Sequence, residues 1–239
     1  VEAGYSRNRG ATIIGLELYL GDFRTICDGY RAASGTLFIP EMRRSKEGLA
    51  QMMLAIGELG AIGASPFGVD SLVQGEPAWL RLKDGFGQLR AVAECLRDFP
   101  DAMARGFVLD VDHPSAELDF NGFVLRIGTG PKGMTPASAY PAYGIAIEET
   151  PGRILLAGRG FMAHFGTSGS GSTGILAAEE ISGSDGRTVT RRFNGDEIFS
   201  GKFAVFPGIE PIPDAADQPI PISADMTGIV RYTFYRFEG

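Results

Sequence analysis

Two periodicities alternate along the first hundred residues, and this alternation constrains the fold more than any other feature of the sequence. Strand-like apolar runs lie near residues 11–19, 36–40 and 61–70, and a helix-like spacing of apolar residues follows each run. Three consecutive strand–helix units predict parallel strands with helices packed outside them, because right-handed crossovers are nearly obligatory. The first part of the chain is therefore predicted to be α/β.

Each predicted helix has a recognisable start and one apolar face. Asp22 and Ser45 are placed to cap the first two helices, and the third spans roughly residues 76–98. Gly85 and Gly87 weaken the third pattern without breaking it. The three apolar faces consist of Phe23, Ile26, Cys27 and Tyr30; of Leu49, Met52, Met53 and Ile56; and of Leu82, Phe86, Leu89, Ala93 and Leu96.

Both a doubly wound sheet and part of an eight-stranded barrel fit three strand–helix units. A dinucleotide-binding sheet would need a glycine-rich G-x-G-x-x-G turn after a strand, and the sequence lacks it. In a (β/α)8 TIM barrel, catalytic groups lie at the carboxyl ends of the strands, where Tyr19, Glu41 and the loop 65–70 fall. We therefore predict that residues 1–100 are the last three βα units of a TIM barrel.

The character of the chain changes after about residue 101. Short β-rich segments follow one another: GFVLDV, GFVLRIG, YGIAIEE, RILLAG, GFMAHF and VRYTFYRF. Turn dipeptides separate several of them, at Pro151-Gly152, Asp185-Gly186 and Asn194-Gly195. Residues 101–239 are therefore predicted to form an antiparallel β-sandwich domain, with a hairpin whose tip is Asp185-Gly186.

Charge and composition exclude several classes of function. The 22 basic and 29 acidic residues give a net charge of −7, and the scattered basic residues form no stripe for nucleic acid. No apolar run reaches the ~18 residues of a membrane span. Cys27 and Cys95 match no metal or redox spacing and are predicted to be buried thiols, and His113 and His164 are the only histidines. We expect no metal and no cofactor.

Five segments resemble one known group of enzymes. They are LELYLGDF (16–23), LFIPE (37–41), AIGASPFGVDS (61–71), RRFNGDE (191–197) and VRYTFYRF (230–237). Together they resemble a β-galactosidase-like glycoside hydrolase of clan A, related to family 35, that carries a C-terminal β-domain. The resemblance covers nearly the whole chain from about residue 11, and the two long motifs around residues 37–71 are specific only in combination.

The resemblance implies a role for Glu41. In this clan the nucleophile is a Glu at the end of the seventh barrel strand, and LFIPE places Glu41 there. The acid/base Glu belongs at the end of the fourth strand, usually after an Asn, but this chain starts near the sixth strand and contains no Asn-Glu pair. Glu17 stands where the group more often has Asp. An N-terminal barrel segment or a companion chain would therefore supply the acid/base carboxyl.

Retaining glycosidase chemistry accounts for a carboxylate at this strand end. One carboxylate attacks the anomeric carbon while a second carboxyl about 5–5.5 Å away protonates the departing oxygen. The attacking group must be ionised, and Arg43 or Arg44 could favour its charged form. The alternative for Glu41 is a rim carboxylate in a structural salt bridge.

Three further residues are candidates for substrate binding. Tyr19 could bond to Glu41 or a sugar hydroxyl, although ordinary packing explains a tyrosine there equally well. Phe67 could offer an apolar platform to a sugar face, and Asp70 could accept hydrogen bonds from hydroxyls. The alternative for Asp70 is a turn or capping residue.

Two functions remain open. The first is a retaining β-glycosidase that hydrolyses terminal β-galactosides through a glycosyl-enzyme on Glu41. The alternative is a non-catalytic carbohydrate-binding or scaffolding β-sandwich module with a barrel remnant. The expected partners are a carbohydrate substrate and the missing barrel segment, with a homo-oligomer as a further option. A periplasmic or extracellular location is slightly favoured over a cytoplasmic one.

Overall fold

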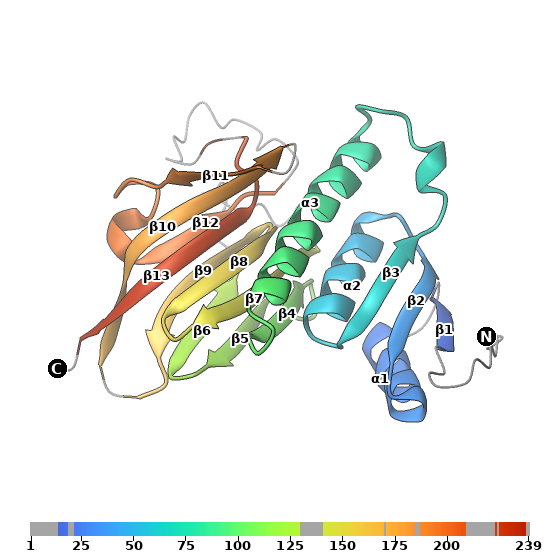
Figure 1. The fold of residues 1–239 in the computed structure, drawn as a ribbon, viewed down its shortest axis with the longest axis horizontal. Coiled ribbons are helices and arrows are strands. Elements are labelled where there is room, and N and C mark those ends of the chain that lie inside the picture. Colours follow the sequence, from blue (N-terminus) through green and yellow to red (C-terminus); the bar gives the residue numbers. More distant parts are fainter. Residues whose placement is uncertain are drawn as a thin grey trace.

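One small parallel sheet and two antiparallel sheets make up the fold in the computed structural model of the protein (Figure 1). The described residues are 14–18, 22–129, 141–169, 171–184, 187–208, 223 and 225–237, and at 14–18, 184, 187 and 188 only the backbone is described. The predicted mixed architecture, α/β first and antiparallel β afterwards, is confirmed. No barrel is closed within these residues, because the parallel strands form an open sheet.

The parallel sheet contains the three predicted strand–helix units. Its elements are β1 (Ile14–Leu18), α1 (Phe23–Ser34), β2 (Leu37–Met42), α2 (Lys46–Gly57), β3 (Ala61–Pro66), a 3-10 turn (Val69–Ser71) and α3 (Pro77–Asp98). The strand order is β1-β2-β3, and both strand pairs are parallel. None of the helices in the described part of the chain is long and apolar enough to cross a membrane.

The predicted capping residues set the starts of the first two helices. The Asp22 carboxylate accepts hydrogen bonds from the Thr25 backbone N–H at 3.3 Å and from its hydroxyl at 2.7 Å. The Ser45 hydroxyl accepts from the Gly48 N–H at 3.2 Å. These bonds satisfy backbone donors that the first turn of a helix leaves unpaired. At the other end of α1, Gly35 adopts the left-handed conformation with φ 74°.

The buried face of α3 differs from the predicted one. Phe86 and Ala93 were expected in the core, but Phe86 is 42% exposed and Ala93 is also exposed. The buried residues of the helix are Leu82, Gly85, Gln88, Val92 and Cys95. The helix presents Gly85 to α2, where a Cβ would overlap the Leu49 side chain. Hydropathy alone could not select a contact face that contains a glycine and a glutamine.

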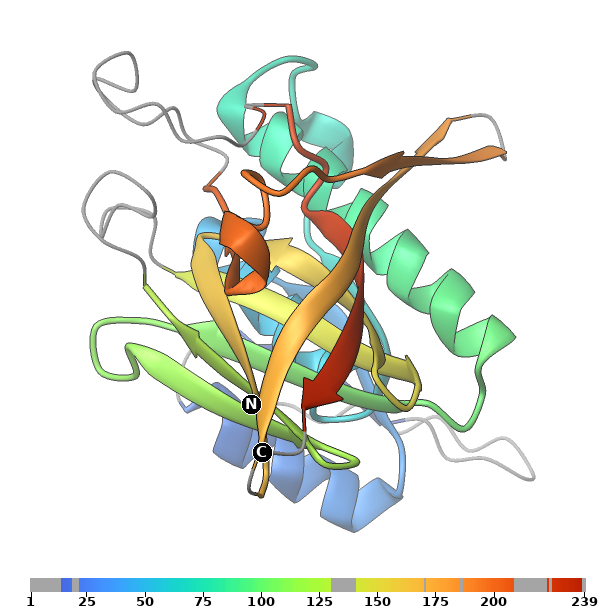
Figure 2. The same ribbon diagram turned by 90° about the vertical axis from the view of Figure 1, so that its left-hand side faces the viewer.

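The antiparallel sheets share one hydrophobic core. Their strands are β4 (Met103–Leu109), β5 (Ser115–Phe120), β6 (Phe123–Gly128), β7 (Ala142–Thr150), β8 (Arg153–Arg159), β9 (Phe161–Thr167), β10 (Ser172–Ser184), β11 (Arg187–Arg192), β12 (Phe203–Phe206) and β13 (Ile229–Phe237). The strand orders are β11-β10-β13-β8-β7-β4 and β12-β9-β6-β5 (Figure 2). Both sheets contribute side chains to the core, where the Phe161 and Phe206 rings stack with centroids 4.5 Å apart.

The predicted hairpin near residue 185 is present. Strands β10 and β11 pair in antiparallel fashion, with Ser184 opposite Arg187. The predicted tip itself, Asp185-Gly186, lies outside the described residues. Asn194 begins the following turn, where its side-chain oxygen accepts from the N–H groups of Asp196 at 2.9 Å and Glu197 at 3.1 Å.

Helix α2 connects the parallel sheet to the antiparallel region. It packs against β3 on one side and against β4 and β7 on the other. At its end the backbone approaches β4 closely, because a Cβ at Gly57 would lie 3.1 Å from the Cα of Gly106. The Glu58 carboxylate then accepts the Gly106 N–H at 3.2 Å. The hydrophobic core around α2 includes side chains from both sides of residue 100, and the predicted domain boundary there stays a prediction.

Gly48 is required by the turn between β2 and α2. A Cβ at this position would overlap the backbone carbonyl oxygen of Arg43. We expect Gly48→Ala to lower the free energy of unfolding by about 2–3 kcal/mol, because the backbone must shift to relieve the overlap. Gly87→Ala is the matched control, since nothing lies within 4 Å of the added methyl. It should stabilise α3 by about 0.5–1 kcal/mol. Denaturant unfolding measures both, and equal effects would contradict this prediction.

Candidate functional site

Glu41 lies at the carboxyl end of the middle parallel strand. In β2, Leu37, Ile39 and Met42 are fully buried in the core beneath the helices. Glu41 is half-buried and directly precedes Met42. The pairing of β2 with β3 shifts register between Ile39 and Met42, so side chains do not alternate regularly between the two faces through Glu41.

A second carboxylate-bearing residue is adjacent to Glu41 in the backbone register. Glu17 of β1 is the Cα partner of Glu41, and the pairing shifts between Gly15 and Glu17. Paired parallel strands lie ~4.8 Å apart. The predicted site residue Tyr19 follows β1 directly and lies outside the described residues. The carboxyl ends of β1 and β2 therefore lie side by side at one edge of the sheet.

The loop after β3 returns to the end of β2. The Phe67 backbone N–H donates to the Met42 carbonyl at 2.8 Å, which places Phe67 beside the residue that follows Glu41. The Phe67 side chain is 64% exposed, so its ring is available to a ligand. Asp70 is also exposed and lies in the 3-10 turn Val69–Ser71. The structure therefore brings the Phe67 and Glu41 segments together, and Asp70 follows one short turn later.

Arg44 holds this loop through its side chain. Its Nη1 donates to the Gly68 carbonyl and, at 2.5 Å, to the Ser71 hydroxyl. The Ser71 hydroxyl donates to the same Gly68 carbonyl at 2.9 Å. Sequence reasoning considered Arg44 only as a cation near Glu41 and missed Gly68 and Ser71. The signal available was the glycine in PFGVDS, since Gly68 adopts φ 67°.

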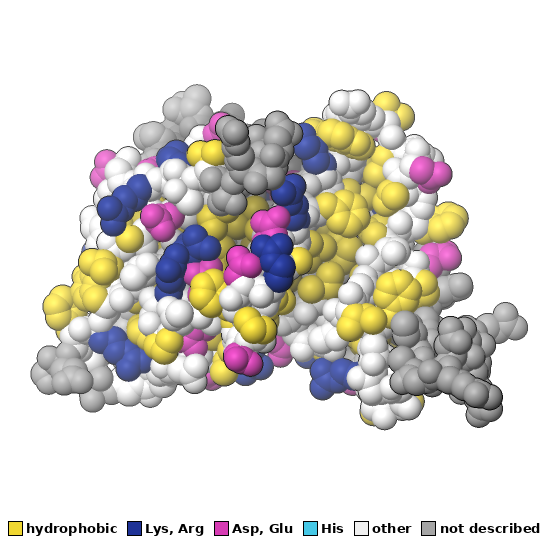
Figure 3. Space-filling view, in the orientation of Figure 1, with side chains coloured by type: hydrophobic (Ala, Val, Ile, Leu, Met, Phe, Trp, Pro, Cys, Tyr) yellow, Lys and Arg dark blue, Asp and Glu magenta, His cyan; other side chains and the backbone are white. Residues whose placement is uncertain are grey.

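Apolar side chains gather beside this loop. The large hydrophobic residues exposed on β3, the loop and α3 are Ile62, Phe67, Val69, Val73, Leu80 and Phe86. Figure 3 shows hydrophobic atoms concentrated over this side of the molecule. On the sheet itself the Phe38 ring packs over Gly63, where a Cβ would lie 3.1 Å from the ring. A contiguous exposed apolar surface is typical of an interface or a ligand site.

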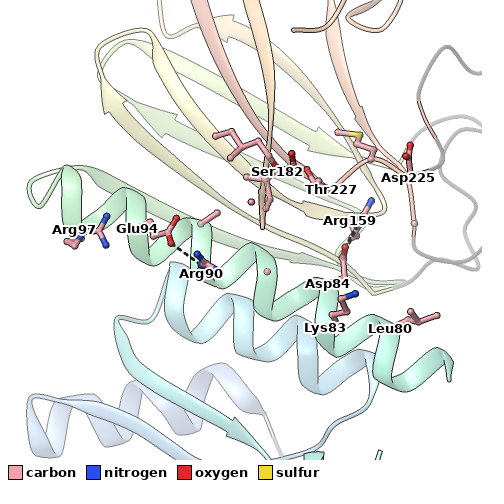
Figure 4. A pocket seen from close by; sticks show the side chains of 17 residues that line it. Leu80, Lys83, Asp84, Arg90, Glu94, Arg97, Arg159, Ser182, Asp225 and Thr227 are labelled. Atoms are coloured by element: carbon pink, nitrogen blue, oxygen red, sulfur yellow. Dashed lines mark hydrogen bonds and ion pairs between the residues drawn. The ribbon is translucent and has the colours of Figure 1, made fainter. Parts of the chain in front are cut away.

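A separate groove of about 870 Å³ lies between α3 and the six-stranded sheet. Asp84 of α3 faces Arg159 of β8 across it, at 2.6 and 2.9 Å, and Arg90 pairs with Glu94 along the helix at 2.9 Å (Figure 4). The Asp84–Arg159 pair therefore links α3 to the six-stranded sheet, whereas the Arg90–Glu94 pair lies within the helix. No group of three metal-ligating side chains occurs among the described residues.

Both cysteines are free thiols buried in the core, as predicted. Burial raises the pKa of Cys27 to about 11. Burial, together with the adjacent Glu149 carboxylate, raises the pKa of Cys95 to about 12. A thiol reacts as its thiolate, so neither cysteine is suited to nucleophilic chemistry near neutral pH.

One protein-family model matches the chain. Residues 82–205, just over half of the chain, match the model of a family described as a domain of unknown function (DUF5597). The chain belongs to this family. No curated protein matches it. The DUF5597 match runs from within α3 into β12, so it includes most strands of the two antiparallel sheets but not β13, and it does not include Glu41 or Phe67.

Proposed function

We propose that this chain is part of a retaining β-glycosidase of the β-galactosidase type, with Glu41 as its nucleophile. The observation that supports this most is the placement of the half-buried Glu41 at the carboxyl end of a parallel strand. Catalytic groups of TIM barrels lie at that end of their strands. The exposed Phe67 ring, anchored beside the same strand end, suits the apolar face of a sugar.

The proposed reaction has two steps. The Glu41 carboxylate attacks the anomeric carbon, and the bond to the leaving oxygen breaks as a second carboxyl protonates that oxygen. Water then attacks the glycosyl-enzyme, and the second carboxylate removes its proton, which releases the sugar with retained configuration. Phe67 and Asp70 would bind the sugar, and so would Tyr19.

In this proposal β1, β2 and β3 are the last three strands of a (β/α)8 barrel. Two observations support it: the three strands are parallel in consecutive order, and the apolar surface on β3, the loop and α3 is exposed. Closing the barrel requires five more strands, from an N-terminal segment or a companion chain. The same polypeptide would supply the acid/base Glu. The two antiparallel sheets would form an accessory β-sandwich that packs against α2 and α3.

A second candidate is a non-catalytic carbohydrate-binding or scaffolding β-sandwich module with a barrel remnant. Exposed aromatic side chains on β13 would suit sugar stacking, since Tyr235 and Phe237 lie edge to face with centroids 4.9 Å apart. This candidate predicts sugar binding without turnover.

The test is an assay of the gene product that contains these residues, with all five additional strands present. We expect hydrolysis of an aryl β-galactoside, and proton NMR of the first-formed sugar should show the β-anomer. The 239 residues alone should show no turnover above background, because one carboxyl is absent. Inactivity of the complete protein, or the α-anomer as first product, would contradict the proposal. Ordinary enzymatic rates from the 239 residues alone would contradict the barrel assignment.

A further inference from the structure

Arg44 and Glu41 lie on the same strand end, three residues apart in the sequence. Arg44 reaches 24 residues forward to the Gly68 carbonyl. Its second bond, at 2.5 Å, reaches the Ser71 hydroxyl at the end of the 3-10 turn. A single guanidinium nitrogen therefore fixes both ends of the turn that contains Asp70 to the segment that contains Glu41.

The backbone around Gly68 is suited to this contact. Gly68 adopts φ 67°, a conformation that disfavours residues with a side chain. A Cβ at Gly68 would lie 3.4 Å from Arg44 Nη1, at the lower edge of ordinary contact. The Ser71 hydroxyl bonds to the same carbonyl as Arg44, at 2.9 Å, so the three residues form one hydrogen-bonded group. The loop is also held at its start, because the Phe67 N–H donates to the Met42 carbonyl of β2.

We propose that Arg44 is a positioning residue that fixes the loop 67–71, and with it the Phe67 ring, at the entrance to the sugar site. The substrate part of this inference rests on the proposed function. Phe67 is exposed, so the hydrogen bonds of its own N–H and of the adjacent Gly68 carbonyl position the backbone that carries its ring. Because Arg44 acts on the loop, its loss should weaken ground-state binding of the sugar more than it slows the chemical step.

The experiment compares Arg44→Gln with Arg90→Gln, an exposed position on α3, in the complete protein. Arg44→Gln should raise KM for an aryl β-galactoside by about tenfold while kcat changes by less than about threefold. Hydrogen exchange at residues 67–71 should become faster, and Ser71→Ala should cause a smaller change in the same direction. Arg44→Lys should raise KM and speed exchange less than Arg44→Gln does, since an ammonium can still donate to the two oxygens. Arg90→Gln should leave KM and exchange unchanged.

The two readouts separate the inference from the proposed function. If the wild-type protein hydrolyses no glycoside, the proposed function is wrong, and the exchange rates alone decide whether Arg44 fixes the loop. If the wild-type protein is active but Arg44→Gln changes neither KM nor exchange at 67–71, the positioning role is overturned. Faster exchange with unchanged KM would overturn the part of the inference that concerns the sugar site.

Discussion

Glu41→Gln in the complete enzyme should lower turnover of a β-galactoside by at least about 10⁴-fold, because the amide cannot attack the anomeric carbon. The fold should be retained, since Glu41 is half-buried and is not part of the hydrophobic core cluster. A mechanism-based fluorosugar should form a stable adduct on Glu41, and peptide mass spectrometry would locate it. The measurements are initial rates and the mass of the labelled peptide.

Two comparisons make the Glu41 result specific. Glu94→Gln replaces a carboxylate that pairs with Arg90 on the surface of α3 and should leave the rate unchanged. Glu17→Gln replaces the register partner of Glu41 and shows whether the Glu17 carboxylate contributes to turnover. Near-normal turnover of Glu41→Gln, or an adduct on another carboxylate, would show that Glu41 is not the nucleophile.

Glu149→Ala should lower the free energy of unfolding by about 3–5 kcal/mol, because it leaves the Arg231 guanidinium without its partner in a mostly buried site. The Glu149 side chain is fully buried on β7, while Arg231 on β13 is 20% exposed. Two Arg231 nitrogens donate to it at 2.7–2.9 Å, and Arg153 Nε lies 3.0 Å away. Denaturant unfolding monitored by circular dichroism provides the measurement.

The control for Glu149 is the exposed pair Arg90–Glu94, where both side chains are about half exposed. Glu94→Gln should change the unfolding free energy by no more than about 0.5 kcal/mol. A double variant, Glu149→Leu with Arg231→Met, should recover most of the stability, since apolar residues can replace a buried ion pair. Equal effects of Glu149→Ala and Glu94→Gln would contradict the assignment of a buried, stabilising pair.

The sequence was sufficient to predict the helices and strands wherever the signal was local. Asp22 and Ser45 were identified as caps because capping depends on residues two or three positions away. The contact face of α3 was not predictable in this way. Gln88 is fully buried on that face, where its side-chain nitrogen donates to the Asp84 carboxylate at 3.0 Å. Asp84 is in turn held by Arg159 of β8, which lies far away in the sequence. Tertiary contact, not hydropathy, selected that face.

The candidate site divides along the same line. The strand-end position of Glu41 followed from a short local pattern, LFIPE, and the structure places it at the end of β2. The role of Arg44 was not predictable, because its hydrogen-bond acceptors lie 24 and 27 residues away. A loop that returns to a preceding strand end leaves no periodic trace in the sequence. Its position depends on the length of the intervening helix and strand.

Helix α2 is mostly buried, since seven of its twelve residues are buried and Glu47 is its one exposed residue. Such a helix cannot be detached from either sheet without exposing apolar area to water, which costs about 25 cal/mol per Å². Separation of the parallel sheet from α2 would therefore expose the helix that also packs against β4 and β7. The parallel strands and the β-rich region should melt as a single cooperative unit, and a chain cut between them would lose part of the core from each fragment.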